Sequence, residues 1–194
     1  MRRRLAVAVA RLRRDETGYS LMELIVSMSI LAAVMTSISV LLVSATNAEV
    51  DMNKRFQAQT SARLGLDRLR REVHCAQSVA VSGTAVAGRY PVATLTIPTT
   101  CPTAGGLSAI TWCSQASGTR WELWRYESAT CSGTGRKWAD ALNQATLFSY
   151  SPQSPTSLAF LTVRLPVNVP SSRALSSYVL EDNVVLRNST RTAL

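Results

Sequence analysis

The stretch Gly18-Tyr19-Ser20-Leu21-Met22-Glu23 is followed by twenty uncharged residues, 24–43, and this segment decides the architecture of the chain. A helix of about twenty apolar residues spans the roughly 30 Å hydrocarbon core of a bilayer, so we expect a transmembrane helix here. Glu23 stands out because an ionised carboxylate without a partner is costly in lipid. We expect it to have a partner or a task, the alternative being an interfacial position from which it reaches the headgroups.

A basic leader precedes this segment. Within residues 1–18, six arginines stand against only Asp15 and Glu16. Positive flanks stay cytoplasmic, so the chain after residue 43 is predicted to lie outside the cytoplasm. A secretory signal peptide is one alternative, but its apolar region runs only about 7 to 15 residues and ends in a small-residue cleavage site. A generic single-pass anchor is another, and it leaves Glu23 unexplained.

Residues 18–25 resemble the processing site of type IV prepilins and of the pseudopilins of type II secretion systems. The resemblance implies that a prepilin peptidase cuts after Gly18 and that the new N-terminal residue, Tyr19, is methylated. Glu23 is then the fifth residue of the mature chain, which in that family meets the N-terminal amine of a neighbouring subunit during filament assembly. Two features depart from the usual pattern: Tyr19 stands where phenylalanine is usual, and no proline interrupts residues 24–43.

Composition bounds the rest of the chain. Its 194 residues leave room for one folded domain beyond the membrane segment. The formal net charge of +9 falls to about +5 if the leader is removed, because the leader carries six arginines and two acidic residues. The mature chain is therefore only mildly basic, unlike a typical nucleic-acid-binding composition.

The four cysteines all follow residue 43. An even number in an exported domain predicts two disulfides, for which three pairings are possible. We prefer Cys113 with Cys131, across a Trp-rich hairpin, and Cys75 with Cys101, joining the helix end to the first loop. A Cys-His nucleophile at His74-Cys75 is disfavoured because neighbouring helix residues point in different directions. The sequence has one histidine and no C-x-x-C pair, which are too few ligands for a typical metal site, so we expect no metal and no cofactor. We expect His74 to be an exposed residue at the end of the helix.

The segment 44–75 continues the helical pattern. Residues 47–73 contain no proline and one glycine, Gly65, and apolar or small residues recur three and four positions apart. We therefore expect one unbroken helix from about residue 19 to about residue 74, membrane-spanning to about residue 43 and amphipathic afterwards. Three charge pairs at i, i+4 are interpreted as a solvated helix face: Asp51 with Arg55, Asp67 with Arg71, and Arg68 with Glu72.

After Cys75, Ser, Thr, Gly and Pro become frequent and short alternating segments replace the helical period. Strands are expected at residues 77–81, 92–97, 109–113, 120–126, 146–150, 158–165, 178–180 and 184–186. We expect a hairpin around Ser117-Gly118 and a turn, rather than a cation site, at Glu181-Asp182-Asn183. The sequence thus predicts an α+β fold. A cleaved leader (1–18) precedes a long N-terminal helix (19–75), which covers a small antiparallel sheet in a β-rich head domain (76–194).

The order of parts also resembles that of W-type minor pilins and J-type pseudopilins. The matching parts are the helix end at residues 62–74, a hairpin, the strand Phe148-Ser149-Tyr150 and the segment Val184-Val185-Leu186-Arg187-Asn188. This resemblance implies a minor position in a filament, near its tip or in the initiating complex.

Basic residues interleaved with aromatic residues allow a nucleic-acid-binding interpretation. The residues are Arg120, Arg125, Arg136 and Lys137, among Trp121, Trp124, Tyr126 and Trp138. Stacking together with phosphate contacts is how proteins hold single strands. Core aromatics with solvated arginines explain the same residues, and we prefer that interpretation.

The sequence favours a structural subunit over an enzyme, because acidic residues are sparse beyond the helix and none are paired at a spacing suited to general acid–base work. The expected partners are other pilin or pseudopilin subunits, prepilin peptidase and the cytoplasmic membrane. We predict a single-pass protein of the cytoplasmic membrane, with its head domain outside the cytoplasm, that joins a cell-surface or periplasmic filament.

Overall fold

The computed structural model describes residues 18–82, 89–102, 104–169 and 177–189. Of the predicted leader, residues 1–17 lie outside the described residues. The chain forms two compact units, Met1–Glu49 and Val50–Leu194, and each is described by itself.

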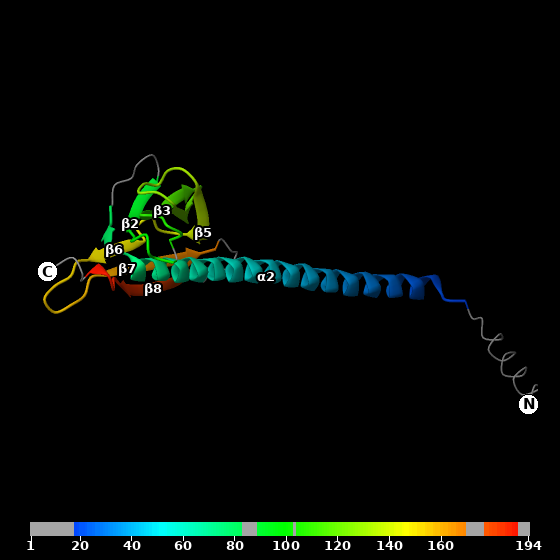
Figure 1. The fold of residues 1–194 in the computed structure, drawn as a ribbon. Coiled ribbons are helices and arrows are strands. Elements are labelled where there is room, and N and C mark those ends of the chain that lie inside the picture. The colour runs from blue at the N-terminus through cyan, green and yellow to red at the C-terminus, as the bar shows by residue number, and fades with distance from the viewer. Residues whose placement is uncertain (1–17, 83–88, 103, 170–176, 190–194) are drawn as a thin grey trace, which may run out of the picture. The chain divides into compact units, whose positions relative to one another are not determined.

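Helix α2 (Leu21–Cys75) is the long helix expected from about residue 19 to about residue 74 (Figure 1). Proline is absent from it, so no backbone N–H is removed from its hydrogen-bond ladder. At its C-terminal end the Asn188 side-chain amide donates to the carbonyl of Cys75 at 2.9 Å. This bond satisfies one of the carbonyls that every helix end leaves without an intrahelical partner.

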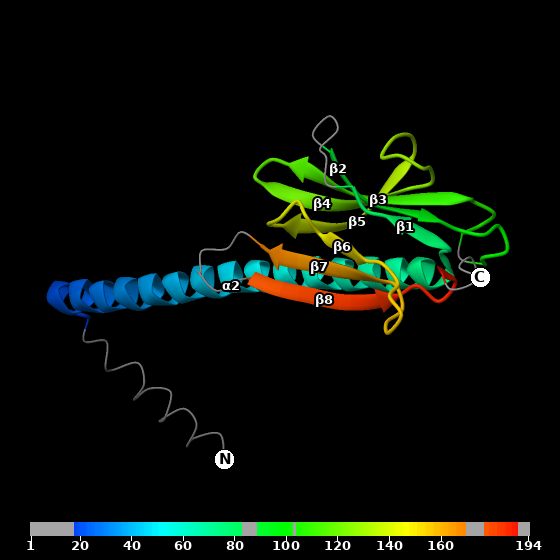
Figure 2. The same ribbon diagram turned by 90° about the vertical axis from the view of Figure 1, so that its left-hand side faces the viewer.

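Within the described residues, eight strands follow the helix and form one antiparallel sheet (Figure 2). They are β1 (Ser78–Ala80), β2 (Arg89–Thr96), β3 (Ala109–Ser117), β4 (Arg120–Tyr126), β5 (Gly135–Leu142), β6 (Phe148–Ser151), β7 (Phe160–Asn168) and β8 (Ser177–Val185). The spatial order is β1-β2-β3-β4-β5-β7-β6, and β8 pairs with β7 along its whole length. The predicted α+β class, a long helix and an antiparallel sheet, is confirmed.

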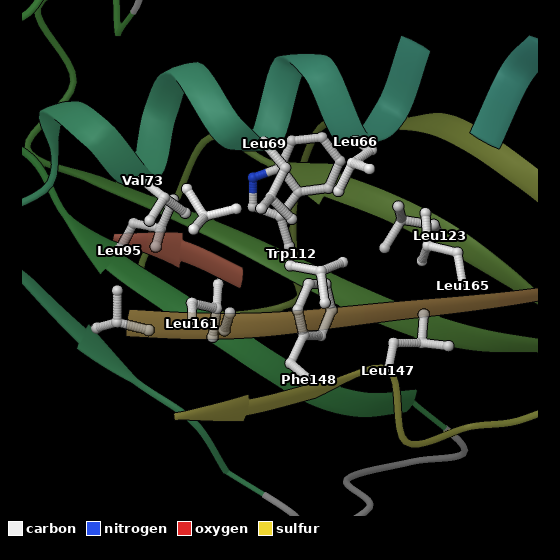
Figure 3. Packing of buried hydrophobic residues seen from close by; sticks show 14 of the residues in the cluster. Leu66, Leu69, Val73, Leu95, Trp112, Leu123, Leu147, Phe148, Leu161 and Leu165 are labelled. Carbon is white, nitrogen blue, oxygen red and sulfur yellow. The ribbon is translucent and has the colours of Figure 1, made fainter. Parts of the chain in front are cut away.

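The C-terminal part of α2 buries one face against the sheet. Its buried residues are small or apolar and recur three or four positions apart, apart from Glu72: Ala58, Ala62, Gly65, Leu66, Leu69 and Val73. Trp112 of β3 is fully buried next to Leu66 and Leu69 (Figure 3). A Cβ at Gly65 would lie 3.3 Å from the Cβ of Trp138 in β5, so the missing side chain lets helix and sheet approach closely.

Strands β7 and β8 run alongside this part of α2 (Figures 1 and 2). Arg70 donates to the Asp182 carboxylate from Nη2 at 2.8 Å and from Nε at 2.9 Å. The Nδ1 atom of His74 lies 2.9 Å from the carbonyl oxygen of Val185, and a carbonyl can only accept, so this nitrogen carries the proton. His74 is therefore half-buried against β8, and the expectation of an exposed helix-end residue is wrong.

The predicted hairpin at Ser117-Gly118 is confirmed by the register of β3 and β4, in which Ser117 pairs with Arg120. The two-residue loop needs a positive φ at its first position, and Gly118 supplies it with a φ of 60°. Strand β5 was not expected from the sequence, because its three charged residues and its tryptophan do not alternate cleanly with apolar residues.

The prediction of a turn at Glu181-Asp182-Asn183 is wrong, because β8 runs unbroken through these residues. Polar residues fit this strand because each has a neighbour. Asp182 accepts from Arg70, Asn183 accepts from the Thr162 hydroxyl at 2.7 Å, and Glu181 lies 3.7 Å from Arg164. Cross-strand and strand–helix partners thus outweigh the local turn preference.

Candidate functional site

The start of α2 is set by the four residues Ser20-Leu21-Met22-Glu23. The Glu23 backbone N–H lies 3.2 Å from the Ser20 hydroxyl and 3.0 Å from the Ser20 carbonyl oxygen, both of which can accept from it. Ser20 is therefore the N-cap, and Glu23 is the third residue of the helix, as in the Ser-x-x-Glu capping pattern. The carboxylate of Glu23 stands in the first turn, where the helix dipole favours negative charge.

The peptide bond between Gly18 and Tyr19 lies just outside the helix. Both residues are non-helical and exposed, and Tyr19 keeps 81% of its surface accessible. A Cβ built on Gly18 would meet no atom within 4 Å. This bond is therefore open to an enzyme, and cutting it leaves Ser20 in place to cap the helix.

The first half of α2 is apolar on all sides. It makes α2 long and apolar enough to cross a membrane, and no other helix in the described part of the chain meets that test. The β domain follows the helix in the sequence, an order consistent with single-pass topology. The large apolar side chains of residues 19–43 are exposed.

Serine and threonine hydroxyls in the apolar segment donate back to the helix. The bonds run from Ser27, Ser29, Thr36, Ser37, Ser39 and Thr46 to carbonyl oxygens three or four residues earlier, at 2.8 to 3.0 Å. A hydroxyl satisfied in this way costs little in hydrocarbon. These six hydroxyls therefore leave the helix apolar enough to cross a membrane, and Glu23 remains the conspicuous polar group near its start.

A buried ionic cluster joins α2 to the sheet. The Glu72 side chain has no exposed surface, and its Oε1 atom accepts from Arg68 Nε and from Arg125 Nε, both at 2.8 Å. Its Oε2 atom accepts from the Trp112 indole N–H at 2.9 Å. The interpretation of Arg68 and Glu72 as a solvated pair is therefore wrong for Glu72. Glu72 lies between Leu69 and Val73 on the buried stripe of α2. This position in the apolar repeat is the feature of the sequence that could have indicated its burial.

The basic residues considered for nucleic-acid binding do not form one free patch. Arg125 is 7% exposed and is held by Glu72 and Glu127, so it is not the solvated arginine expected. In the antiparallel register of β4 and β5, Arg136 lies opposite Arg125 and Lys137 lies opposite Trp124. Successive strand residues point to opposite faces of the sheet, so Arg136 and Lys137 are separated. Arg120 donates to the Asn168 carbonyl, and Lys137 lies 3.3 Å from Glu122.

All four cysteines form disulfides. Cys75 is bonded to Cys101 and Cys113 to Cys131, with Cα atoms 6.1 and 6.2 Å apart. These are the two pairs preferred from the sequence. Cys75–Cys101 ties the helix end to the β2–β3 connection, and Cys113–Cys131 ties β3 to the β4–β5 connection. Among the described residues no cluster of three or more His, Cys, Asp or Glu side chains is placed to hold a metal ion.

Comparison with protein-family models, with curated proteins and with solved structures found no match to this chain.

Proposed function

We propose that this protein is a minor pilin or pseudopilin subunit. It is processed by prepilin peptidase after Gly18, methylated at Tyr19 and assembled through α2 into a type IV pilus or a type II secretion pseudopilus. Its role is structural rather than catalytic, and its partners are other subunits of the same filament. The α+β head domain carried on a long helix supports this proposal, together with the resemblance to W-type minor pilins and J-type pseudopilins.

The position of the Gly18–Tyr19 bond carries the proposal. A peptidase binds an extended chain, and this bond precedes the helix by two residues in exposed, non-helical backbone. After cleavage the mature chain would begin with Tyr19, retain Ser20 as its N-cap and enter the helix at once. An ordinary membrane anchor has no need of a glycine, a cap and an acidic residue in this register.

Glu23 supplies the assembly step. The mature chain has a free amine on Tyr19, and a carboxylate and an ammonium buried together cost far less than either group alone. In a filament, the Glu23 carboxylate would pair with the N-terminal amine of a neighbouring copy or a related subunit. This pair would fix the register in which the apolar helices leave lipid and pack.

The test is mass spectrometry of the N-terminal peptide, from cells with and without prepilin peptidase. We expect a methylated Tyr19 N-terminus in the first and an uncleaved leader in the second. The Gly18→Val variant should keep its leader in both strains, because a β-branched residue obstructs the peptidase while its Cβ meets no neighbour in the chain. The Ser20→Ala variant is the control, since it alters the helix cap and leaves the cut site unchanged. An N-terminus other than Tyr19, or one independent of the peptidase, would overturn the proposal.

A further inference from the structure

A small pocket opens between α2 and the β4–β5 hairpin, within the unit Val50–Leu194. Its volume is about 300 Å³, close to the lower limit for a small-molecule site. We name it the arginine pocket, and it is lined by Arg68, Arg125, Glu127, Thr134, Gly135, Arg136 and Trp138. Arg125, Arg136 and Trp138 are among the residues considered above for nucleic-acid binding, and the proposed filament function does not use the pocket.

Two arginines of the pocket face each other directly across the sheet. Arg125 of β4 is the register partner of Arg136 of β5, so their side chains leave the same face of the sheet. Like charges directly opposite on neighbouring strands destabilise a sheet. The third arginine, Arg68, reaches the pocket from α2. The lining thus carries three guanidinium groups and one carboxylate, Glu127, while the buried Glu72 pairs with Arg68 and Arg125 from within the protein.

The guanidinium of Arg125 is already held in place. Its side chain is only 7% exposed, and its Nε atom donates to buried Glu72 at 2.8 Å. Its Nη1 atom donates at 2.8 Å to Glu127, a surface residue whose side chain is 56% exposed. A carboxylate at the mouth of the pocket is therefore the group that Arg125 binds in this structure. Because Glu127 is exposed, a carboxylate from outside can replace it at little cost.

Trp138 forms the aromatic side of the pocket. The guanidinium carbon of Arg136 lies 4.8 Å from the centre of its ring, a cation–π distance that orients the arginine. The indole Nε1 of Trp138 is buried and has no hydrogen-bond partner in the described part of the chain. A buried donor without an acceptor is unfavourable, and such groups call for an explanation. Trp138 lines the pocket, so the signal of its indole ring can report on a group that binds there.

We propose that the arginine pocket receives an acidic side chain from a partner protein, whose carboxylate takes the place of Glu127 on Arg125 and pairs with Arg136. The pocket, with a volume of about 300 Å³, has ample room for a carboxylate side chain. Glu127 shows that a protein carboxylate fits this position.

The experiment uses the full chain in a non-ionic detergent, with its tryptophan side chains labelled for NMR. The probe is a short peptide with blocked ends and one Glu, titrated at constant ionic strength, and the matched peptide carries Gln. The Trp138 indole signal should move and saturate with the Glu peptide and stay still with the Gln peptide. Equal shifts with both peptides, or no saturable shift, would overturn the proposal.

Variants of opposite sign make the test specific. Glu127→Gln removes the competing carboxylate and should strengthen binding several-fold, whereas Arg136→Gln removes a charged donor and should weaken it about tenfold. Arg164→Gln is the control, because Arg164 lies on β7, outside the pocket, and faces Glu181 on β8. Equal weakening by Arg136→Gln and Arg164→Gln would show general attraction to a basic surface and refute the site. So would binding of inorganic phosphate or galacturonate in place of the Glu peptide.

Discussion

Replacing Glu72 is predicted to destabilise the unit Val50–Leu194 far more than the loss of an exposed ion pair would. Glu72 is fully buried and accepts three hydrogen bonds, from Arg68, Arg125 and Trp112. Methionine roughly keeps the shape of the Glu72 side chain. In the Glu72→Met variant, however, Arg125 loses its buried carboxylate partner and the Trp112 N–H loses its acceptor.

The magnitude follows from burial. Removing one partner of a buried ion pair costs about 3–5 kcal/mol. Arg125 would keep its pairing with the exposed Glu127, so we expect the lower end of this range, about 3 kcal/mol. The Arg68 contribution is smaller because that side chain is 26% exposed. In the double variant Glu72→Met/Arg125→Met no buried charge remains, and the main residual cost is the unsatisfied indole N–H, about 1–3 kcal/mol. Both variants leave the Trp112 N–H without its acceptor, so the double variant should be more stable than the single one by the buried-charge cost, about 3 kcal/mol.

The assay is denaturant unfolding in non-ionic detergent with the disulfides intact. All four tryptophans lie after residue 110, so their fluorescence reports the unfolding of this unit and not of the apolar helix. Arg70→Gln is the matched control, since its ion pairs with Asp67 and Asp182 are exposed and should cost under about 1 kcal/mol. If Glu72→Met cost no more than Arg70→Gln, or if the cost of Arg125→Met simply added to it, the reasoning would be refuted.

Two further variants test the packing of the head domain by the same unfolding assay. Replacing Cys113 and Cys131 together by alanine should cost about 3 kcal/mol, because the bond closes a loop with a sequence separation of 18, and a change under about 1 kcal/mol would contradict this. Gly135→Ala should cost about 1–3 kcal/mol, because the added Cβ would lie 2.5 Å from the ring of Tyr126, and an unchanged midpoint would show that this ring is free to move.

The elements with a clean period were predictable from the sequence. Residues 47–73 repeat small and apolar side chains every three or four positions, and the structure buries that stripe from Ala58 to Val73. The hairpin at Gly118 was readable because a two-residue loop requires a glycine-type φ. The cysteine pairs were accessible because each joins segments that the predicted elements already bring close.

The long-range polar contacts were not predictable in the same way. The i, i+4 spacing of Arg68 and Glu72 is visible in the sequence, but Arg125 lies 53 residues further on and Trp112 lies 40. Only the sheet register brings these side chains under the helix. Strand β5 was missed for a related reason: it is held by its pairing with β4 and by the contact of Trp138 with Gly65, and its own alternation is weak.

Glu23 stands at the start of an apolar helix either as part of the helix cap or as the partner of another subunit's amine, and a neutral isostere separates the two roles. A local capping role would survive Glu23→Gln, because glutamine serves equally well in the capping pattern. Pairing with the amine of another subunit would not survive, because the carboxylate charge is lost and an unpaired ammonium in lipid costs several kcal/mol. Ser20→Ala is the complementary variant, which weakens the cap by about 1 kcal/mol and keeps the charge.

The measurement is the ratio of mature protein in isolated filaments to mature protein in the membrane, determined by quantitative mass spectrometry in cells that carry only the variant. We predict that Glu23→Gln lowers this ratio at least about tenfold, while Ser20→Ala leaves it near the wild-type value. A Glu23→Gln protein that enters filaments as well as the wild type would contradict the account.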